Sequence, residues 1–144
     1  MTQLNFYEPI YDITADAGVR VKGKDLKQVL CNLIFATINE MVELPKIEPK
    51  QELTIKVSSI GFPYLLADVV NKILYLFEVK KFIPAQCEVL ELSPEGTTVT
   101  ILLKGEKYNP QKHGKKLLIK AATYHKLSLK KKDEFFEAEV IFDI

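Results

Sequence analysis

The segment YLLADVVNKILYLFEVKK, from Tyr64 to Lys81, constrains the fold more than any other part of the sequence. Its apolar side chains recur with helical spacing, but they occupy most sides of the helix instead of one stripe. Such a helix is buried on more than one face, so it needs further layers of structure around it. Pro63 precedes the segment and suits a helix start, since a missing backbone N–H costs nothing there.

A second helix is predicted from Lys24 to Met41. Asp25 suits its first turn, because a carboxylate there is stabilised by the helix dipole. The helix should end before LPKIEPKQ, whose prolines and charges indicate a loop. Its apolar stripe consists of Leu26, Val29, Leu30, Leu33 and Ile38.

Strand patterns surround the two predicted helices. ELTIKVSS alternates like a strand, and AQCEVLEL and TTVTILLK form a predicted hairpin around the turn SPEG. After the polar loop KYNPQKHGKK, the strands KLLIKAAT, HKLSLK and FFEAEVIFDI complete the chain. The order strand, helix, strand, helix and then several strands predicts an α+β fold, with two helices packed on a largely antiparallel β-sheet. We expect residues 1–144 to form a single domain, since this length can bury one sizeable core.

The charge distribution argues against a dedicated nucleic-acid binder. The net charge is +1, although ten lysines face six acidic residues from Thr97 onward. This mildly basic C-terminal part leaves one alternative function open, a small RNA- or nucleotide-binding module in which Tyr108, Tyr124 and Phe135 stack on bases. The run Lys130–Lys132 is either a solvated hairpin tip or a phosphate contact.

The cysteines and histidines give few signs of chemistry. Cys31 and Cys87 lie in apolar contexts, so we expect reduced core thiols, which fits a cytoplasmic protein. No Cys/His spacing indicates zinc. His113 lies in a polar loop and is predicted to be a solvated surface residue, whereas His125 has a structural or a functional role. No signal peptide or membrane-spanning run is expected.

The aspartates near the two ends of the chain are the candidate functional residues. Asp12 and Asp16 flank the start of the first strand, where a turn or cap role is the simpler interpretation. Asp143 lies beside the α-carboxyl group of Ile144, and neighbouring negative charges cost free energy unless a cation offsets them. If the first and last strands are neighbours, Asp16, Asp143 and the terminal carboxylate converge. Three carboxylates offer the hard oxygen ligands that Ca²⁺ or Mg²⁺ prefers.

Four segments together resemble the archease family: DITADAGVRVKG, LLADVVNKILYLFE, GEKYNPQKHGKKLLIKAATYHKLSL and AEVIFDI. They occur in the family's order and cover nearly the whole chain. One position departs from the family pattern, since most members carry His before Thr-Ala-Asp and this chain has Ile13. We therefore assign no metal role to that position.

The resemblance implies an α+β fold that contains a strand-helix-strand-strand module. It also implies a cytoplasmic protein cofactor, without turnover of its own, of the RNA ligase that joins tRNA halves in tRNA splicing. Such a cofactor promotes guanylylation of the ligase's active-site histidine and lets the ligase turn over repeatedly; it meets tRNA only through the ligase. The family's metal ligands transfer to Asp16, Asp143 and the terminal residue Ile144, with Ca²⁺ as the first choice among divalent cations. Asp12 is then a capping residue or supports a ligand from behind.

Two further expectations concern the surface and the competing classes. Lys115, Lys116 and Lys130–Lys132 are candidates for contact with the ligase or its RNA. A metal-dependent hydrolase is the third class considered, but too few catalytic partners accompany the carboxylates.

Overall fold

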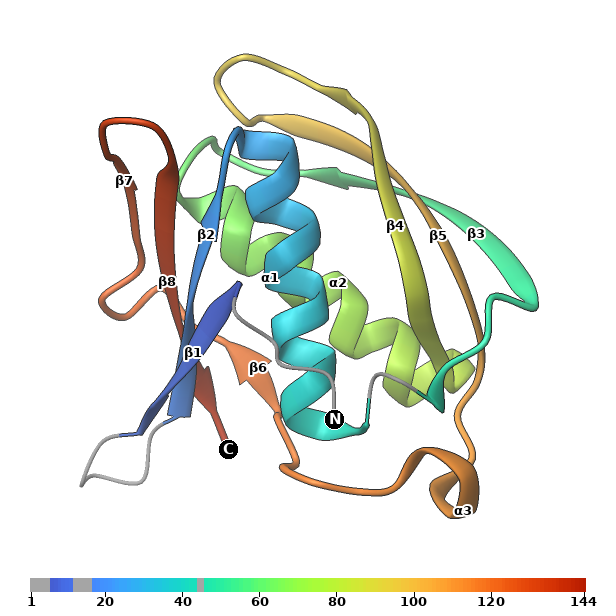
Figure 1. Ribbon diagram of the computed structural model, residues 1–144. Helices are drawn as coiled ribbons and strands as arrows, with labels where there is room; N and C mark the ends of the chain where they lie inside the picture. The colour runs from blue at the N-terminus through green and yellow to red at the C-terminus, as the bar shows by residue number, and fades with distance from the viewer. Residues whose placement is uncertain (1–5, 12–16, 44–45) are drawn as a thin grey trace.

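The computed structural model describes residues 6–11, 17–43 and 46–144. Two helices lie between two antiparallel sheets (Figure 1). The helices are α1 (Leu26–Met41) and α2 (Tyr64–Lys80), and a short helix α3 (Pro110–His113) follows later in the chain. The first sheet contains, in order, β1 (Tyr7–Tyr11), β2 (Ala17–Gly23), β8 (Phe136–Asp143) and β6 (Ala121–Ala122), with β7 (Ser128–Lys131) also paired to β8. The second sheet has the order β3 (Gln51–Ser58), β5 (Thr98–Lys107) and β4 (Phe82–Leu92).

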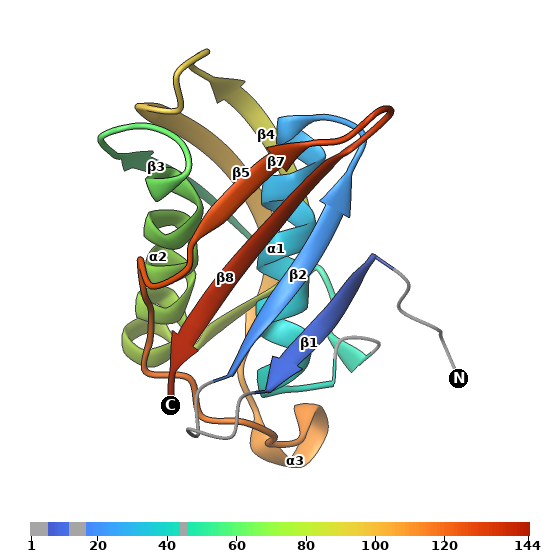
Figure 2. The same cartoon turned by 90° about the vertical axis from the view of Figure 1, so that its left-hand side faces the viewer.

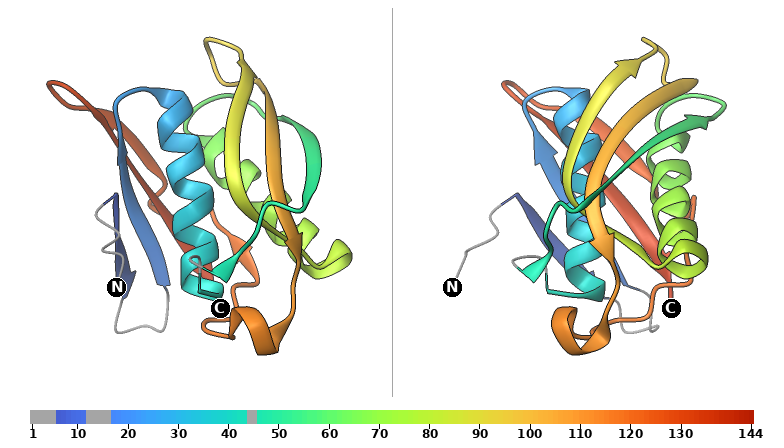
Figure 3. Two further views of the ribbon diagram at one scale, coloured as in Figure 1. Left: turned by 45° about the vertical axis from the view of Figure 1, so that its right-hand side comes forward. Right: turned by 90° about the vertical axis from the view of Figure 1, so that its right-hand side faces the viewer.

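The α+β fold predicted from the sequence is confirmed, and the helices pack on two sheets. β3, α2, β4 and β5 follow one another along the chain and form the strand-helix-strand-strand module. This second sheet crosses the helices on the side opposite to β8 (Figure 3). The apolar character of α2 on most sides is explained by this arrangement, because the helix contacts layers on both sides.

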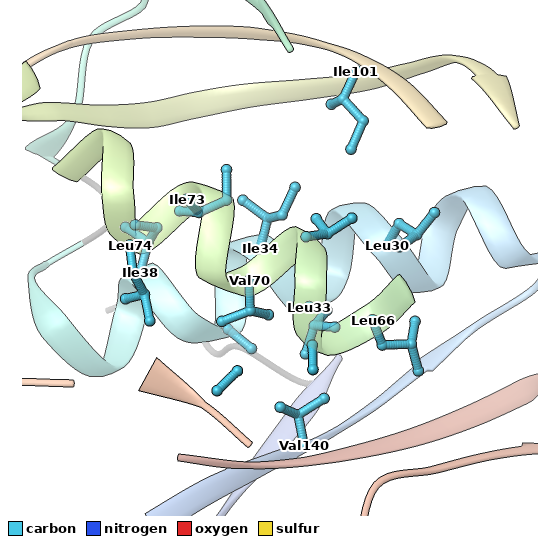
Figure 4. Close-up of a cluster of buried hydrophobic side chains, with 14 of the residues drawn as sticks. Leu30, Leu33, Ile34, Ile38, Leu66, Val70, Ile73, Leu74, Ile101 and Val140 are labelled. Carbon is cyan, nitrogen blue, oxygen red and sulfur yellow. The ribbon is translucent and has the colours of Figure 1, made fainter. Parts of the chain in front are cut away.

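The core lies between the two sheets. Ile101 of β5 points at the helices from one side and Val140 of β8 lies on the other side, with apolar side chains of α1 and α2 between them (Figure 4). Ile34 of α1 and Leu66 of α2 are fully buried in this layer. Burial of this apolar surface is the main stabilising contribution to the fold.

The pairing of β2 with β8 brings the start of β2 beside the carboxyl end of β8. Ala17 pairs with Phe142, and Gly23 pairs with Phe136 at the other end of the ladder. Gly18 is required here by close packing, because a Cβ atom would lie 2.5 Å from the carbonyl oxygen of Val140. The strand that follows Asp16 is thus the second strand, β2, and it is the neighbour of the last strand, β8, while β1 lies at the sheet edge beyond it.

Several local expectations are confirmed or changed. Asp25 caps α1, and its carboxylate accepts a hydrogen bond from the Gln28 backbone N–H at 2.8 Å. KLLIKAAT, which was expected to be a full strand, pairs only at Ala121–Ala122. The polar loop after β5 contains α3, which Asn109 caps and Pro110 begins.

The prediction of reduced cysteines is wrong. Cys31 of α1 and Cys87 of β4 form a disulfide bond, with their Cα atoms 5.7 Å apart. The two residues are 56 positions apart in sequence, so their contact arises only when α1 packs against β4. The part of the cytoplasmic expectation that rested on reduced thiols loses its support. Within the described ranges, α1 and α2 are too short or too polar to cross a bilayer, and α3 is a single turn.

Candidate functional site

The carboxyl end of β8 is held on both sides by main-chain hydrogen bonds. β2 pairs with one edge through Ala17 and Phe142, and β6 pairs with the other edge through Ala121 and Asp143. The Lys120 N–H also donates to the Asp143 carbonyl at 2.8 Å. The C-terminus therefore leaves the first sheet at a fixed position, at the end of the molecule where β2 begins (Figure 2).

Burial changes abruptly along the last three residues. Phe142 is fully buried among the helices, whereas Asp143 is exposed and Ile144 is 38% exposed. Phe142 thus anchors the strand, and the next residue places the Asp143 carboxylate at the surface. This carboxylate offers two oxygen atoms for a hard cation such as Ca²⁺.

The structure places only part of the predicted metal site. Asp143 and Ile144 lie together at the end of β8, while Asp12, Ile13 and Asp16 fall outside the described residues. In residues 6–11, 17–43 and 46–144 no three His, Cys, Asp or Glu side chains gather around one point. The convergence of Asp16 with Asp143 stays a prediction. Ala17, the sequence neighbour of Asp16, pairs with Phe142, the sequence neighbour of Asp143.

A second polar cluster, which the sequence analysis missed, lies where α1 ends beside β1. The hydroxyl groups of Tyr7 and Tyr11 donate to the two carboxylate oxygens of Glu40, at 2.5 Å and 2.8 Å. Burial together with the bond to Glu40 raises the pKa of Tyr7, and the bond to Glu40 raises the pKa of Tyr11. The spacing of four residues within one strand puts both tyrosines on one face, which is the sequence signal for this cluster.

A third polar cluster surrounds α3. His113 is fully buried, so its predicted place on the surface is wrong. Its Nδ1 accepts a hydrogen bond from the Asn109 backbone N–H at 2.9 Å, which leaves the proton on Nε2. Nε2 lies 2.9 Å from a carboxylate oxygen of Glu106 and therefore donates to it. Asn109 followed by Pro110 is a helix-start signal that would have revealed this turn in the sequence.

Glu106 is the acceptor at the centre of this third cluster. Besides His113, it accepts the Glu48 backbone N–H at 2.8 Å and an ammonium hydrogen of Lys112 at 3.0 Å. Burial alone would raise the pKa of this carboxyl group, but the hydrogen bonds outweigh burial and lower it to about 2. The cluster is internally satisfied, and it fixes the segment that follows β5.

The residues of the RNA-binding alternative do not share one surface. Tyr108, just before α3, donates to the Gly114 carbonyl and packs against Phe77. Phe135 lies under the Lys22 ammonium beside the start of β8, at the other end of the first sheet from α3 (Figure 2). Tyr124 is half exposed and donates to Asp68 of α2 at 2.6 Å.

The candidate lysines also lie on two separate parts of the surface. Lys115 and Lys116 are exposed in the segment after α3, and the Lys116 ammonium donates to the Asn39 carbonyl. Lys130 and Lys131 belong to β7 and Lys132 lies in the turn to β8, at the opposite end of the sheet (Figure 2). His125 is exposed beside Tyr124, and its backbone N–H donates to Thr123.

Comparison with known proteins gives consistent results. The model of the Archease protein family (MTH1598/TM1083) matches residues 7–144. The archease of Methanosarcina acetivorans is 32% identical over 133 residues, which are 91% of each chain. The archease of Sulfurisphaera tokodaii is 26% identical over 144 residues and covers both chains fully.

Two solved structures share the fold. The solution structure of Methanobacterium thermoautotrophicum protein 1598 has a TM-score of 0.79 at 24% identity and covers 98% of this chain and 100% of its own. The crystal structure of an archease from Thermotoga maritima, described as a possible chaperone, has a TM-score of 0.60 at 19% identity, with 93% and 91% covered. The fold is thus that of a small α+β protein with helices between two antiparallel sheets. The chain belongs to the archease family.

Proposed function

We propose that this protein activates the RNA ligase of tRNA splicing in the cytoplasm. It promotes guanylylation of the ligase's active-site histidine and repeated turnover, and it catalyses no reaction itself. Membership of the archease family supports the proposal. The observation that carries it is the pairing of Ala17 with Phe142, because the sequence neighbours of this pair are Asp16 and Asp143.

The same proposal includes a divalent cation, with Ca²⁺ as the first choice. Asp16, Asp143 and the terminal carboxylate of Ile144 would hold it. The donor set fits, since the Asp143 carboxylate is exposed at the strand end, and the α-carboxyl group of the next residue, Ile144, would add two further oxygen donors. When bound, the cation supplies a concentrated positive charge that offsets the neighbouring carboxylates.

The chain's own contribution to activation is positioning. The buried Phe142 and the pairing of β8 on both edges fix the main chain of Asp143, so little conformational freedom is lost there when a partner docks. In this mechanism the acidic end of β8 lies against the ligase active site. There it orients the groups that take part in nucleotidyl transfer, a reaction that depends on geometry and charge stabilisation.

The test is multiple-turnover ligation by the ligase of the same organism. We expect wild-type protein to raise the amount of RNA joined per ligase molecule beyond one turnover. Asp16→Ala and Asp143→Ala should abolish this effect while the proteins stay folded. The matched control is Asp133→Ala, which removes an exposed aspartate in the turn between β7 and β8 and should activate like wild type.

Two outcomes would contradict the proposal. If wild type has no effect on its own ligase, the activator function fails. If the isolated protein instead binds RNA in a strongly salt-dependent way, the RNA-binding alternative is favoured. A C-terminal extension after Ile144 tests the terminal carboxylate separately, since it should impair activation where an N-terminal tag does not.

A further inference from the structure

A groove of about 300 Å³ lies between the outer edge of β3 and the exposed face of α2. Sheet order places β3 at an edge of the second sheet, with β5 as its partner on the inner side. The groove has an apolar floor that includes Ile55, and its rim is polar. It belongs to the second sheet, whereas Asp143 ends a strand of the first, so it is separate from the site proposed above.

The register of β3 shows which main-chain groups face the groove. Ser59 donates to the Thr97 carbonyl at 2.9 Å, in line with the register that pairs Ser58 with Thr98. Hydrogen-bonded and non-hydrogen-bonded pairs alternate along an antiparallel ladder. Thr54 and Lys56 therefore direct their N–H and C=O groups away from β5, and both residues line the groove.

The charged side chains that line the groove are all positive. Lys56 of β3 and Lys72 and Lys80 of α2 line it, and the described lining residues include no Asp or Glu. The Lys72 ammonium lies 5.1 Å from the centre of the Tyr75 ring, which keeps this charge beside the groove. An occupant with negative charges in an extended arrangement complements these three lysines.

We propose that the groove binds an extended acidic segment of a partner protein, which adds to β3 as a further strand. Main-chain hydrogen bonds to Thr54 and Lys56 give affinity, and alternate acidic side chains on the helix-facing side of the segment meet Lys72 and Lys80 of α2. Nucleic acid would satisfy the lysines through its phosphates, but it cannot complete the strand ladder.

The experiment is a titration of the ¹⁵N-labelled full chain with a short peptide of alternating glutamate and valine. We expect the amide signals of Thr54 and Lys56 to shift, and the double variant Lys72→Glu/Lys80→Glu to bind about tenfold or more weakly. The matched control is Lys27→Glu on α1, which makes the same charge reversal outside the groove and should bind like wild type. A lysine–valine peptide should not bind.

The strand pairing is tested with a second peptide that is N-methylated at alternate residues. It keeps every charge but cannot form the ladder, so it should bind at least about tenfold more weakly. Thr54→Pro removes the corresponding N–H of the protein and is compatible with an edge strand. If the methylated peptide binds as tightly as the unmethylated one, the groove recognises charge alone and the proposal is overturned. The same conclusion follows if poly(uridylate) binds the wild type and binds Thr54→Pro equally well. Absence of shifts at Thr54 and Lys56 would overturn it as well.

Discussion

Glu106 beside α3 and Asp143 at the end of β8 are both acidic, but the fold treats them in opposite ways. Glu106 is 5% exposed and accepts hydrogen bonds from His113, Lys112 and the Glu48 backbone. Among the described residues, Asp143 is held only through its main chain, and its side chain is exposed. The hydrogen-bond donors around a carboxylate therefore decide its role. Glu106 serves the fold, whereas Asp143 is available to a cation or a partner.

Glu40 extends the comparison to a third carboxylate. It is buried at the end of α1 and accepts the hydroxyl groups of Tyr7 and Tyr11, so it joins β1 to α1. By the same reasoning Glu40 is structural. We expect changes at Glu106 and Glu40 to affect stability, and a change at Asp143 to affect binding.

The largest effect on stability should come from a feature outside all three sites. Breaking the Cys31–Cys87 bond, by reduction or by serine at both positions, frees a loop that spans 56 residues in the unfolded chain. We expect the free energy of unfolding to fall by about 4 kcal/mol, as measured by urea denaturation with and without reductant. The reduced protein should keep its cation affinity as long as it stays folded. An unchanged urea midpoint on reduction would contradict the role of the disulfide.

The next effect tests the buried side of the comparison. His113→Ala leaves the Glu106 carboxylate without its buried Nε2–H donor, and it should lower the free energy of unfolding by about 3 kcal/mol. The matched control is His125→Ala, an exposed histidine whose loss should change stability by less than about 0.5 kcal/mol. Similar urea midpoints for the two variants would show that the Glu106 cluster does not stabilise the fold.

The pH dependence of stability tests the charge of Glu106. Its pKa is lowered from 4.5 to about 2 in the folded protein, so the unfolded chain binds the proton more readily. The stabilisation is complete above about pH 4.5 and is lost as the pH falls toward 2. The stability difference between wild type and Glu106→Gln, from urea denaturation at several pH values, should therefore shrink in that window. A difference that stays constant would argue against an ionised Glu106.

The sequence predicted the layered part of the molecule well. Helical periodicity gave α1 and α2 within a few residues, and the apolar character of α2 indicated layers on both sides. It did not predict the two separate sheets, because alternation identifies a strand but not its partner. The contact of Cys31 with Cys87 was missed for the same reason, since it depends on how α1 packs on β4.

The sites were predicted unevenly. The last strand, which ends at Asp143, follows from the apolar run before it and is confirmed, whereas metal binding by Asp143 and Ile144 stays a prediction. His113 was misjudged because the loop around it is polar. A single turn of helix capped by Asn109 carries the imidazole into the interior, where Glu106 stabilises it. Tertiary contacts of this kind leave little trace in the composition of a segment.

A smaller effect is expected at Glu40. Tyr11→Phe removes one hydroxyl donor to this carboxylate and should lower the free energy of unfolding by about 1 kcal/mol in urea denaturation. Tyr75→Phe is the matched control, since Tyr75 is 50% exposed and Tyr11 is 67% exposed. Exposure alone would make Tyr75 the more sensitive position. A larger loss at Tyr75 would show that the bond to Glu40 does not hold β1.

The smallest change in stability and the largest change in binding should coincide at Asp143. Calcium titration of the oxidised, folded protein by calorimetry tests this most directly. Wild type should bind Ca²⁺, and Asp143→Asn should lose at least about tenfold in affinity. The same variant should change the free energy of unfolding by less than about 0.5 kcal/mol, and Asp133→Asn should bind like wild type. Equal calcium affinity of wild type and Asp143→Asn would show that Asp143 is not a ligand of the cation.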